Sequence, residues 1–258
     1  MKTKLLFGFL FFLHISFAQE IKTEFIAETP LKADKFIGID VLDNIYYIQN
    51  NILYKKNTSE TLVYSNVKLG KITSVNIQNP FKIILLYKDY NSVIVLDNKL
   101  NELTQAITFS NTNISLVSYA SENNLWIYSK DNNTLQLFDY QNETINLTTQ
   151  PLSFYHENFM ANDLFSSNDN VWLFNQKGVL QFNQYASFIE FHNIKNVELI
   201  FPFKKGFVYI RNDELLFFDN GVSSLISINF PKGKNEIYFN KGKIYIFHNG
   251  ILFQYRIL

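Results

Sequence analysis

The sequence predicts an all-β fold, a single β-propeller of six blades with four strands in each. Two observations lead to this prediction. A short strand of aromatic and β-branched residues recurs after a polar turn at roughly 40-residue intervals, the spacing typical of propeller blades. The 258 residues also include 26 Phe and 15 Tyr, side chains that favour strands and bury large apolar areas. Helical periodicity is nearly absent, and only residues 154–164 could form a short helical turn.

The recurring strand marks one position in each repeat. Successive starts are 38, 42, 46, 36 and 37 residues apart, and they fall at Ile45, Ile83, Leu125, Val171, Phe207 and Ile244. At this spacing residues 19–258 hold six units. The strand is an almost unbroken apolar run in several units, so we expect it to be buried on both faces between neighbouring blades. Trp126 and Trp172 occupy equivalent places in this strand, and we expect them to pack between blades.

The other three strands of a unit follow the same order each time. One strand precedes the recurring strand, a third follows it after a tight turn, and a more polar, alternating fourth strand ends the unit. The turns carry Asn, Asp and Gly, which tolerate positive φ and suit hairpins. Examples of the preceding strand are 72–77, 114–119 and 197–203, and examples of the fourth strand are 143–148 and 187–191.

The last unit has no fourth strand of its own, because the chain ends at Leu258. Residues 22–28 form a spare alternating strand ahead of the first unit. Docking this N-terminal strand at the outer edge of the last blade would complete that blade and cover an open sheet edge. Five or seven blades, or a β-sandwich with irregular spacing, remain alternative architectures.

Residues 1–18 have the three parts of a secretory signal peptide. Lys2 and Lys4 supply the charged start, an apolar run covers 5–17, and Ser16 and Ala18 provide the small residues before a cleavage site at Gln19. The run is shorter than the roughly 20 residues that a spanning helix needs. We therefore expect cleavage between Ala18 and Gln19, a mature domain of residues 19–258, and no direct membrane insertion after cleavage. No cysteine follows the run, which excludes a lipoprotein anchor.

Composition and motifs narrow the function. The net charge is zero, which gives no reason to expect nucleic acid as a partner. The sequence contains no nucleophile elbow, phosphate loop or dinucleotide fingerprint, and His156, His192 and His248 are not spaced as zinc ligands. Paired acids, such as Asp213 with Glu214 and Asp163 near Asp169, are typical of solvated turns. The sequence thus predicts no catalytic, cofactor-binding or metal residues, no cofactor, and a protein that is not an enzyme.

Two repeats resemble a known family. Residues 122–128 and 168–174 are similar to the Asp-x-x-Gly-Asn-Leu-Trp-Ile core of two-component-regulator-type propeller repeats, with Asn123 and Asp169 in place of the glycine. The resemblance implies a propeller fold and no catalytic residues. The overall profile of an exported, cysteine-free, unlipidated propeller also resembles the periplasmic accessory subunits of the type IX secretion system, among them the subunit that plugs the outer-membrane translocon.

These observations favour a non-enzymatic interaction module in the cell envelope, located in the periplasm, that docks through one face on an envelope protein such as an outer-membrane translocon. The alternative is a secreted propeller that binds or hydrolyses a small sugar, lactone or peptide. A third hypothesis is that the protein is a sensor domain detached from its membrane kinase. The structure of the channel mouth discriminates between the first two: charged, convergent side chains favour an enzyme, and a flat or plugged mouth favours docking.

Overall fold

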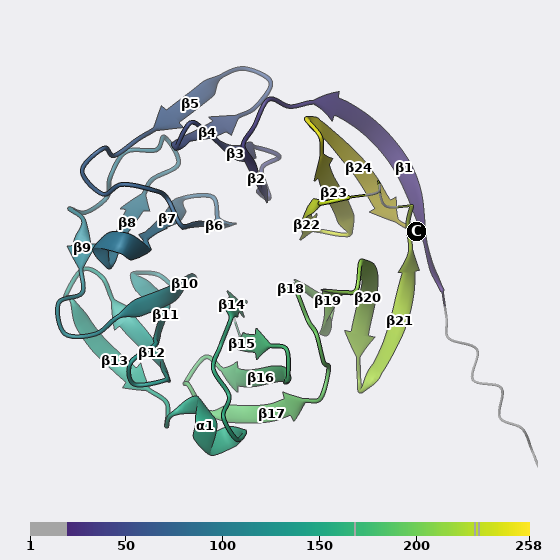
Figure 1. Cartoon of the computed structure of the whole chain (residues 1–258). Coiled ribbons are helices and arrows are strands. Elements are labelled where there is room, and N and C mark those ends of the chain that lie inside the picture. Colours follow the sequence, from purple (N-terminus) through teal and green to yellow (C-terminus); the bar gives the residue numbers. More distant parts are fainter. Residues whose placement is uncertain (1–19, 168, 230, 232) are drawn as a thin grey trace, which may run out of the picture.

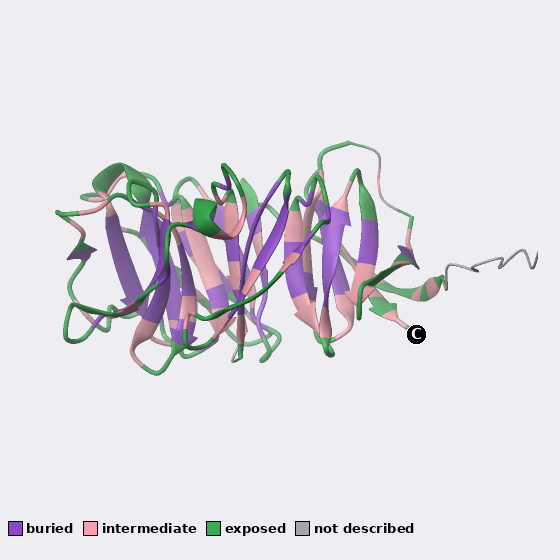
Figure 2. Cartoon of the chain, turned by 90° about the horizontal axis from the view of Figure 1, so that it is seen from below, coloured by how far each residue is buried: buried purple, intermediate pink, exposed green. Residues whose placement is uncertain are grey.

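The computed structural model describes residues 20–258 except 168, 230 and 232. The sheets stand in a ring around a central axis; the four-stranded sheets each have one strand next to the axis, and the eight-stranded sheet has one at each of its two ends (Figure 1). In the side view the strands run between two faces of the ring, and the buried residues lie along the strands (Figure 2). The signal peptide predicted at 1–18, with Ala18 and Gln19 at its cleavage site, falls outside the described residues.

Four sheets have four strands each, and within each sheet the strands follow chain order from the axis outwards (Figure 1). The first sheet contains β2 (Lys35–Ile39), β3 (Ile45–Gln49), β4 (Ile52–Lys56) and β5 (Thr61–Tyr64). The second contains β6 (Ser74–Asn79), β7 (Lys82–Tyr87), β8 (Ser92–Leu96) and β9 (Ile107–Thr108), with the short helix η1 (Lys88–Tyr90) between β7 and β8.

The third and fourth sheets repeat this plan. They contain β10 (Ile114–Ser121), β11 (Asn124–Ser129), β12 (Thr134–Asp139) and β13 (Thr144–Thr148), then β14 (Asp163–Ser166), β15 (Asn170–Asn175), β16 (Gly178–Asn183) and β17 (Phe188–His192). The helix α1 (Leu152–Tyr155) precedes β14. It overlaps only the first two residues of the helical turn that the sequence predicts at 154–164.

The remaining strands form one eight-stranded sheet, in the order β18-β19-β20-β21-β1-β24-β23-β22. Its members are β1 (Ile21–Pro30), β18 (Leu199–Phe203), β19 (Gly206–Arg211), β20 (Glu214–Asp219), β21 (Val222–Ser227), β22 (Glu236–Asn240), β23 (Lys243–His248) and β24 (Ile251–Ile257). β1 pairs antiparallel with β24, which confirms the predicted position of the N-terminal strand. It also pairs in parallel with β21, at Ile21 and Lys22 only, and this contact was not predicted.

The hairpin turns explain why the polar residues of each unit lie where they do. Asn50 and Asn51 between β3 and β4, and Asn212 and Asp213 between β19 and β20, all have positive φ. Two consecutive residues with positive φ define the type I′ turn, whose twist matches that of the flanking strands. Asn and Asp adopt this conformation more readily than other non-glycine residues. The prediction of Asn- and Asp-based hairpins is confirmed.

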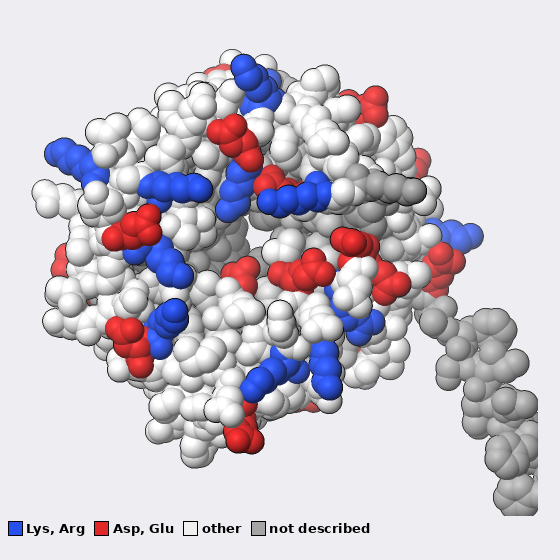
Figure 3. Space-filling model, viewed as in Figure 1, with Lys and Arg blue, Asp and Glu red and all other residues white. Residues whose placement is uncertain are grey.

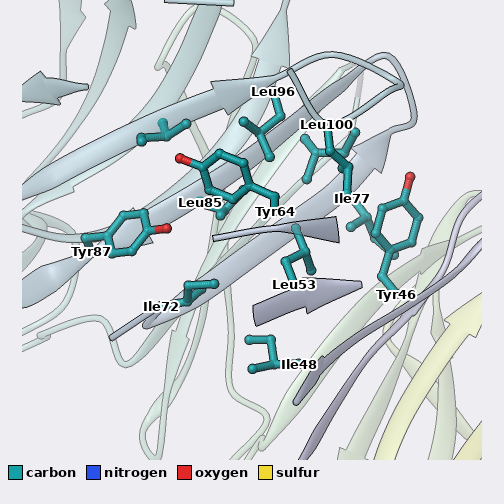
Figure 4. Packing of buried hydrophobic residues seen from close by; sticks show 12 residues of the cluster. Tyr46, Ile48, Leu53, Tyr64, Ile72, Ile77, Leu85, Tyr87, Leu96 and Leu100 are labelled. Atoms are coloured by element: carbon teal, nitrogen blue, oxygen red, sulfur yellow. The ribbon is translucent and has the colours of Figure 1, made fainter. Parts of the chain in front are cut away.

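The core lies between neighbouring sheets rather than at the axis. One cluster joins Tyr46, Leu53 and Tyr64 of the first sheet to Ile83 and Leu85 of the second (Figure 4). Full burial of one such apolar side chain contributes roughly 1.5–3 kcal/mol relative to exposure. β7 shows the pattern clearly, since every residue from Ile83 to Tyr87 is buried. The prediction of a strand buried on both faces is confirmed.

The two tryptophans also lie between sheets. Trp126 packs in a cluster with Leu164 and Leu173 of the next sheet, and Trp172 packs against Phe207 with ring centroids 6.2 Å apart. Both side chains are 5% exposed or less. Their predicted role in packing between sheets is confirmed.

Candidate functional site

The inner strands surround a cavity that we call the entry chamber. It has a volume of about 320 Å³ and is lined from five strands, β2, β6, β14, β18 and β22. These strands all begin on the same side of the ring, which we call the entry face. Figure 3 shows a central hollow ringed by basic and acidic side chains. The residues that line the chamber include Lys35, Asn76, Gln78, Asp163, Phe165, Phe201, Glu236 and Tyr238.

Asp163 is the first residue of β14 and lines the chamber. Its Oδ1 accepts a hydrogen bond of 2.8 Å from the backbone N–H of Leu164. Burial raises the pKa of the Asp163 carboxyl, while this hydrogen bond and the charge of Lys35 act in the opposite direction. Among the described residues no basic side chain forms an ion pair with it. Asp163 is therefore a carboxyl group poised to hold its proton more strongly than usual.

Lys35 and Glu236 face the same chamber from two other strands. Lys35 begins β2 and is exposed at the rim. Glu236 begins β22, and its Oε2 accepts a hydrogen bond of 2.6 Å from the backbone N–H of Phe36. This bond fixes the Glu236 carboxylate and ties β22 to β2, where the last and first units of the chain meet. The mouth is therefore charged, with one ammonium and two carboxyl groups.

Aromatic side chains form the floor of the chamber. Tyr238 lines both the entry chamber and a cavity of about 160 Å³ on the opposite side, as do Ile77, Gln78 and Phe165, so the two cavities adjoin at these residues. The ring centroid of Phe201 lies 5.5 Å from that of Tyr238 and 6.2 Å from that of Phe165. Burial, followed by the charge of Asp40, raises the pKa of the Tyr238 hydroxyl. Tyr238 therefore stays neutral, as a hydrogen-bonding group on an apolar floor.

Amides and hydroxyls line the wall on the β6 side. Asn76 Nδ2 donates to Ser118 Oγ at 3.1 Å, and Ser118 Oγ lies 2.8 Å from Ser166 Oγ. Ser166 Oγ in turn donates to Gln78 Oε1 at 3.1 Å. This network holds both amides in place, because Asn76 is bonded to the buried Ser118 and Gln78 to the buried Ser166. The wall thus presents oriented polar groups beside the apolar floor.

The histidines considered in the sequence lie away from this chamber. His156 stacks near Phe191, His192 bonds Gln181 through Nε2 at 2.7 Å, and His248 lies beside Asn249. No group of three or more His, Asp or Glu side chains among the described residues is placed to hold a metal ion. Asp213 and Glu214 lie at the β19–β20 turn, as the sequence predicts.

No sequence motif marks Lys35 or Glu236, and Asp163 was predicted in the wrong environment. The sequence predicts it to be a solvated turn acid, but the structure places it on an inner strand facing the axis. One signal could have found it. The inner strands β2, β6, β14 and β22 each start with a polar residue followed by an apolar one; the polar residues are Lys35, Ser74, Asp163 and Glu236. A polar residue at that repeated position faces the chamber each time.

The described part of the chain contains no helix that is long and apolar enough to span a membrane. No family model and no curated protein matches the sequence. The similarity to solved structures is clear in shape, however. The chain resembles virginiamycin B lyase from Staphylococcus aureus, with a TM-score of 0.60, 10% identity, and coverage of 93% of this chain and 100% of the lyase.

Two further structures share the fold. The WD40 domain of Pan2 from Neurospora crassa gives a TM-score of 0.58 at 11% identity, covering 87% of this chain and 74% of the domain. BamB from Moraxella catarrhalis gives a TM-score of 0.50 at 13% identity, covering 83% of this chain and 67% of BamB. The chain is therefore a β-propeller, as predicted. No comparison supports the predicted link to type IX secretion.

The similarity to virginiamycin B lyase contradicts the prediction that the protein is not an enzyme, so that prediction is wrong. It depended on the absence of familiar catalytic motifs, yet one of the similar structures is a lyase, and another is described as a catalytically inactive variant of that lyase bound to quinupristin. A propeller can assemble a site from residues contributed one at a time by different sheets, and such a site leaves no contiguous motif. Lys35, Asp163 and Glu236 are contributed in that way.

Proposed function

We propose that this protein is an exported, six-bladed propeller that binds a small sugar-like ligand in the entry chamber. The observation that carries the proposal is the convergence of Lys35, Asp163 and Glu236 above the aromatic floor of one 320 Å³ cavity. Six blades result when the eight-stranded sheet is divided at the two-residue contact between β21 and β1. A charged and convergent mouth is the arrangement expected of a ligand-binding or hydrolytic propeller.

The lining of the chamber suits a sugar. A sugar ring carries many hydroxyls around an apolar C–H face. The Glu236 carboxylate can accept hydrogen bonds from hydroxyls, and the amides of Asn76 and Gln78 can both accept and donate them. The floor formed by Phe165, Phe201 and Tyr238 can pack against the C–H face. The volume is at the small end of the range of about 300–1,000 Å³ that ligand pockets occupy. A mono- or disaccharide therefore fits the site better than a larger ligand.

Asp163 supplies the chemical capability of the site. Burial raises the pKa of this carboxyl, which favours its protonated form, and a protonated carboxyl can donate its proton to a leaving-group oxygen. Glu236, held by the Phe36 N–H, is a second carboxylate in the same chamber. We propose that Asp163 is the proton donor of a reaction on the bound ligand, such as cleavage of a glycosidic bond.

The proposal is tested by ligand screening with the purified protein and two variants. Saturation-transfer NMR against a panel of monosaccharides and disaccharides should identify bound sugars. Tyr238→Leu should abolish their binding, because it removes part of the floor, while Asp163→Asn should retain binding and lose turnover of any cleaved disaccharide. Binding that is unchanged in Tyr238→Leu would place the ligand elsewhere and refute the proposal.

A second candidate function is docking on an envelope protein in the periplasm, as the sequence predicts. The supporting observation is an exposed aromatic patch at α1 and β17, in which Phe154 is 76% exposed and Tyr155 stacks on Phe188 at 4.9 Å. Exposed aromatic clusters are typical of interface hot spots. Crosslinking of the exported protein in the native envelope should recover a partner that Phe154→Ser loses. Equal recovery with both proteins would refute this role of the patch.

A further inference from the structure

A second cavity adjoins the entry chamber on the entry face, and we call it the lysine basin. Its volume is about 870 Å³, and four lysines line it: Lys35, Lys71, Lys88 and Lys234. They come from four separate segments, namely the start of β2, the loop before β6, helix η1 and the loop before β22. Lys35 and Glu236 line both cavities, so the basin and the chamber meet at these two residues.

The four ammonium groups lack protein partners. All four lysines are exposed, and within the described residues none forms an ion pair or donates a side-chain hydrogen bond. Other lysines of the chain do have partners. Lys55 Nζ donates to the carbonyl of Asn98 at 2.7 Å, and Lys177 Nζ donates to the carbonyls of Glu157 and Asn158. The basin therefore gathers unpaired positive charges.

The acidic residues of the basin do not neutralise these lysines by contact. Asp34 Oδ2 accepts a hydrogen bond of 2.6 Å from the backbone N–H of Asn50, and Glu236 is bonded to the N–H of Phe36. Asp89 is the one other acidic residue among those that line the basin. Backbone N–H groups bond two of the three carboxylates, Asp34 and Glu236, but do not cancel their charge, so the four ammonium groups leave the basin with a formal excess of one positive charge. A ligand group that carries negative charge and accepts hydrogen bonds would therefore complement the basin.

We infer that the ligand of this protein is an anionic sugar, whose ring lies in the entry chamber and whose acidic group lies among the lysines of the basin. This inference rests on the proposed sugar-binding function and specifies the substrate class. An ammonium binds as a point charge, so lysines accept a carboxylate or a phosphate without the bidentate selectivity of arginine. The shared chemistry is therefore an acidic group on a sugar ring, either a uronate or a sugar phosphate.

The test uses matched triads of ligands on the glucose, galactose and mannose rings: the neutral sugar, its uronate and its 6-phosphate. Calorimetric titration of the purified protein gives a Kd for each. We expect at least one acid to bind more tightly than its neutral sugar, and this advantage to shrink as salt is added. Whether the uronate or the phosphate is preferred identifies the source of the anionic group.

A double variant, Lys71→Gln with Lys88→Gln, tests the location of the charge recognition. The ratio of the Kd for the neutral sugar to the Kd for its acid should fall roughly tenfold, since each exposed charge pair contributes up to about 1 kcal/mol. Lys130→Gln is the matched control. Lys130 is an exposed lysine between β11 and β12, the turn that corresponds to the one between β7 and β8 where Lys88 lies, and it does not line the basin. It should leave the ratio unchanged.

The other outcomes also decide the matter. If acids and neutral sugars bind equally, or if the double variant behaves like the Lys130 control, the inference is overturned while the sugar site stands. If no sugar of any triad binds, the inference is overturned, and if the disaccharides of the NMR panel also fail to bind, the proposed function is overturned with it.

Discussion

The ring of Tyr238 lies directly against the backbone of Gly38, where a Cβ atom would stand 2.6 Å from the ring carbons Cδ2 and Cε2. Position 38 therefore accepts no side chain as long as Tyr238 forms the floor of the channel. The register of β2 against β3 also shifts between Phe36 and Gly38, which indicates a bulge at this point. This close approach packs β22 against β2 beside the entry chamber, which Tyr238 lines.

Gly38→Ala should lower the free energy of unfolding by about 2 kcal/mol, because the added methyl group overlaps the ring of Tyr238. Chemical denaturation of both proteins measures the change. In a Tyr238→Ala background the same substitution should cost much less, since the overlapping atoms are gone. Strict additivity of the two substitutions would show that the contact is not the cause.

Asp163→Asn should stabilise the fold at neutral pH. Burial raises the pKa of Asp163 in the folded state above its ordinary value of 3.8, so the ionised form costs folding free energy at pH 7. As the pH falls through the folded-state pKa, the native protein takes up the proton first and this cost declines. Below about 3.8 it vanishes, and with it the advantage of the variant.

Thermal unfolding of both proteins across the acid range measures this difference. Asp169→Asn, at an exposed turn of the same sheet, is the matched control and should leave the melting temperature nearly unchanged. A lower melting temperature for Asp163→Asn at pH 7 would contradict the prediction.

His192 should make the protein less stable under mildly acidic conditions. Burial lowers the pKa of its imidazole, and the neighbouring Glu190 only partly opposes this. The unfolded chain therefore takes up a proton below about pH 6.5, the ordinary value for histidine, while the folded protein does not. The free energy of unfolding should fall as the pH drops through that window.

His192→Gln should flatten this pH dependence, although it lowers stability overall by removing the contact with Gln181. The comparison is the slope of the unfolding free energy between neutral and mildly acidic pH. Equal slopes in the parent and His192→Gln would exclude His192 as the titrating group.

Cleavage of the signal peptide should leave Gln19 as the first residue of the exported protein. Signal peptidase needs a small residue before the cut, which Ala18 supplies. Mass spectrometry of the protein purified from cells that express the full-length chain reads the N-terminus directly. Ala18→Phe should accumulate the uncleaved precursor, whereas Gln19→Asn should be processed normally. A mature N-terminus at another residue would disprove this site.

Much of the fold could be predicted because its signals are local. The spacing from Ile45 to Ile244 gave the repeat, the apolar run at 83–87 gave a strand buried on both faces, and pairs such as Asn50 with Asn51 gave the tight turns. The closing strand was predictable because the last unit has too few strands of its own. The parallel contact of Ile21 with Ile226 could not be predicted, because it depends on how β1 runs between the two halves of the eight-stranded sheet.

The candidate site could not be predicted from such signals. Lys35, Asp163 and Glu236 lie far apart in the chain, and each is followed by ordinary apolar strand residues.

The amino-acid pattern alone determines the strands, their turns and the repeat, because each depends on side chains a few residues apart. The site was decided only when the sheets closed into a ring. Ring closure sets which end of each inner strand meets the axis, and it also partly buries Asp163, which raises the pKa of its carboxyl. Contacts between distant units, such as Tyr238 against Gly38, depend on the twist and register of whole sheets, and no local stretch of sequence encodes these.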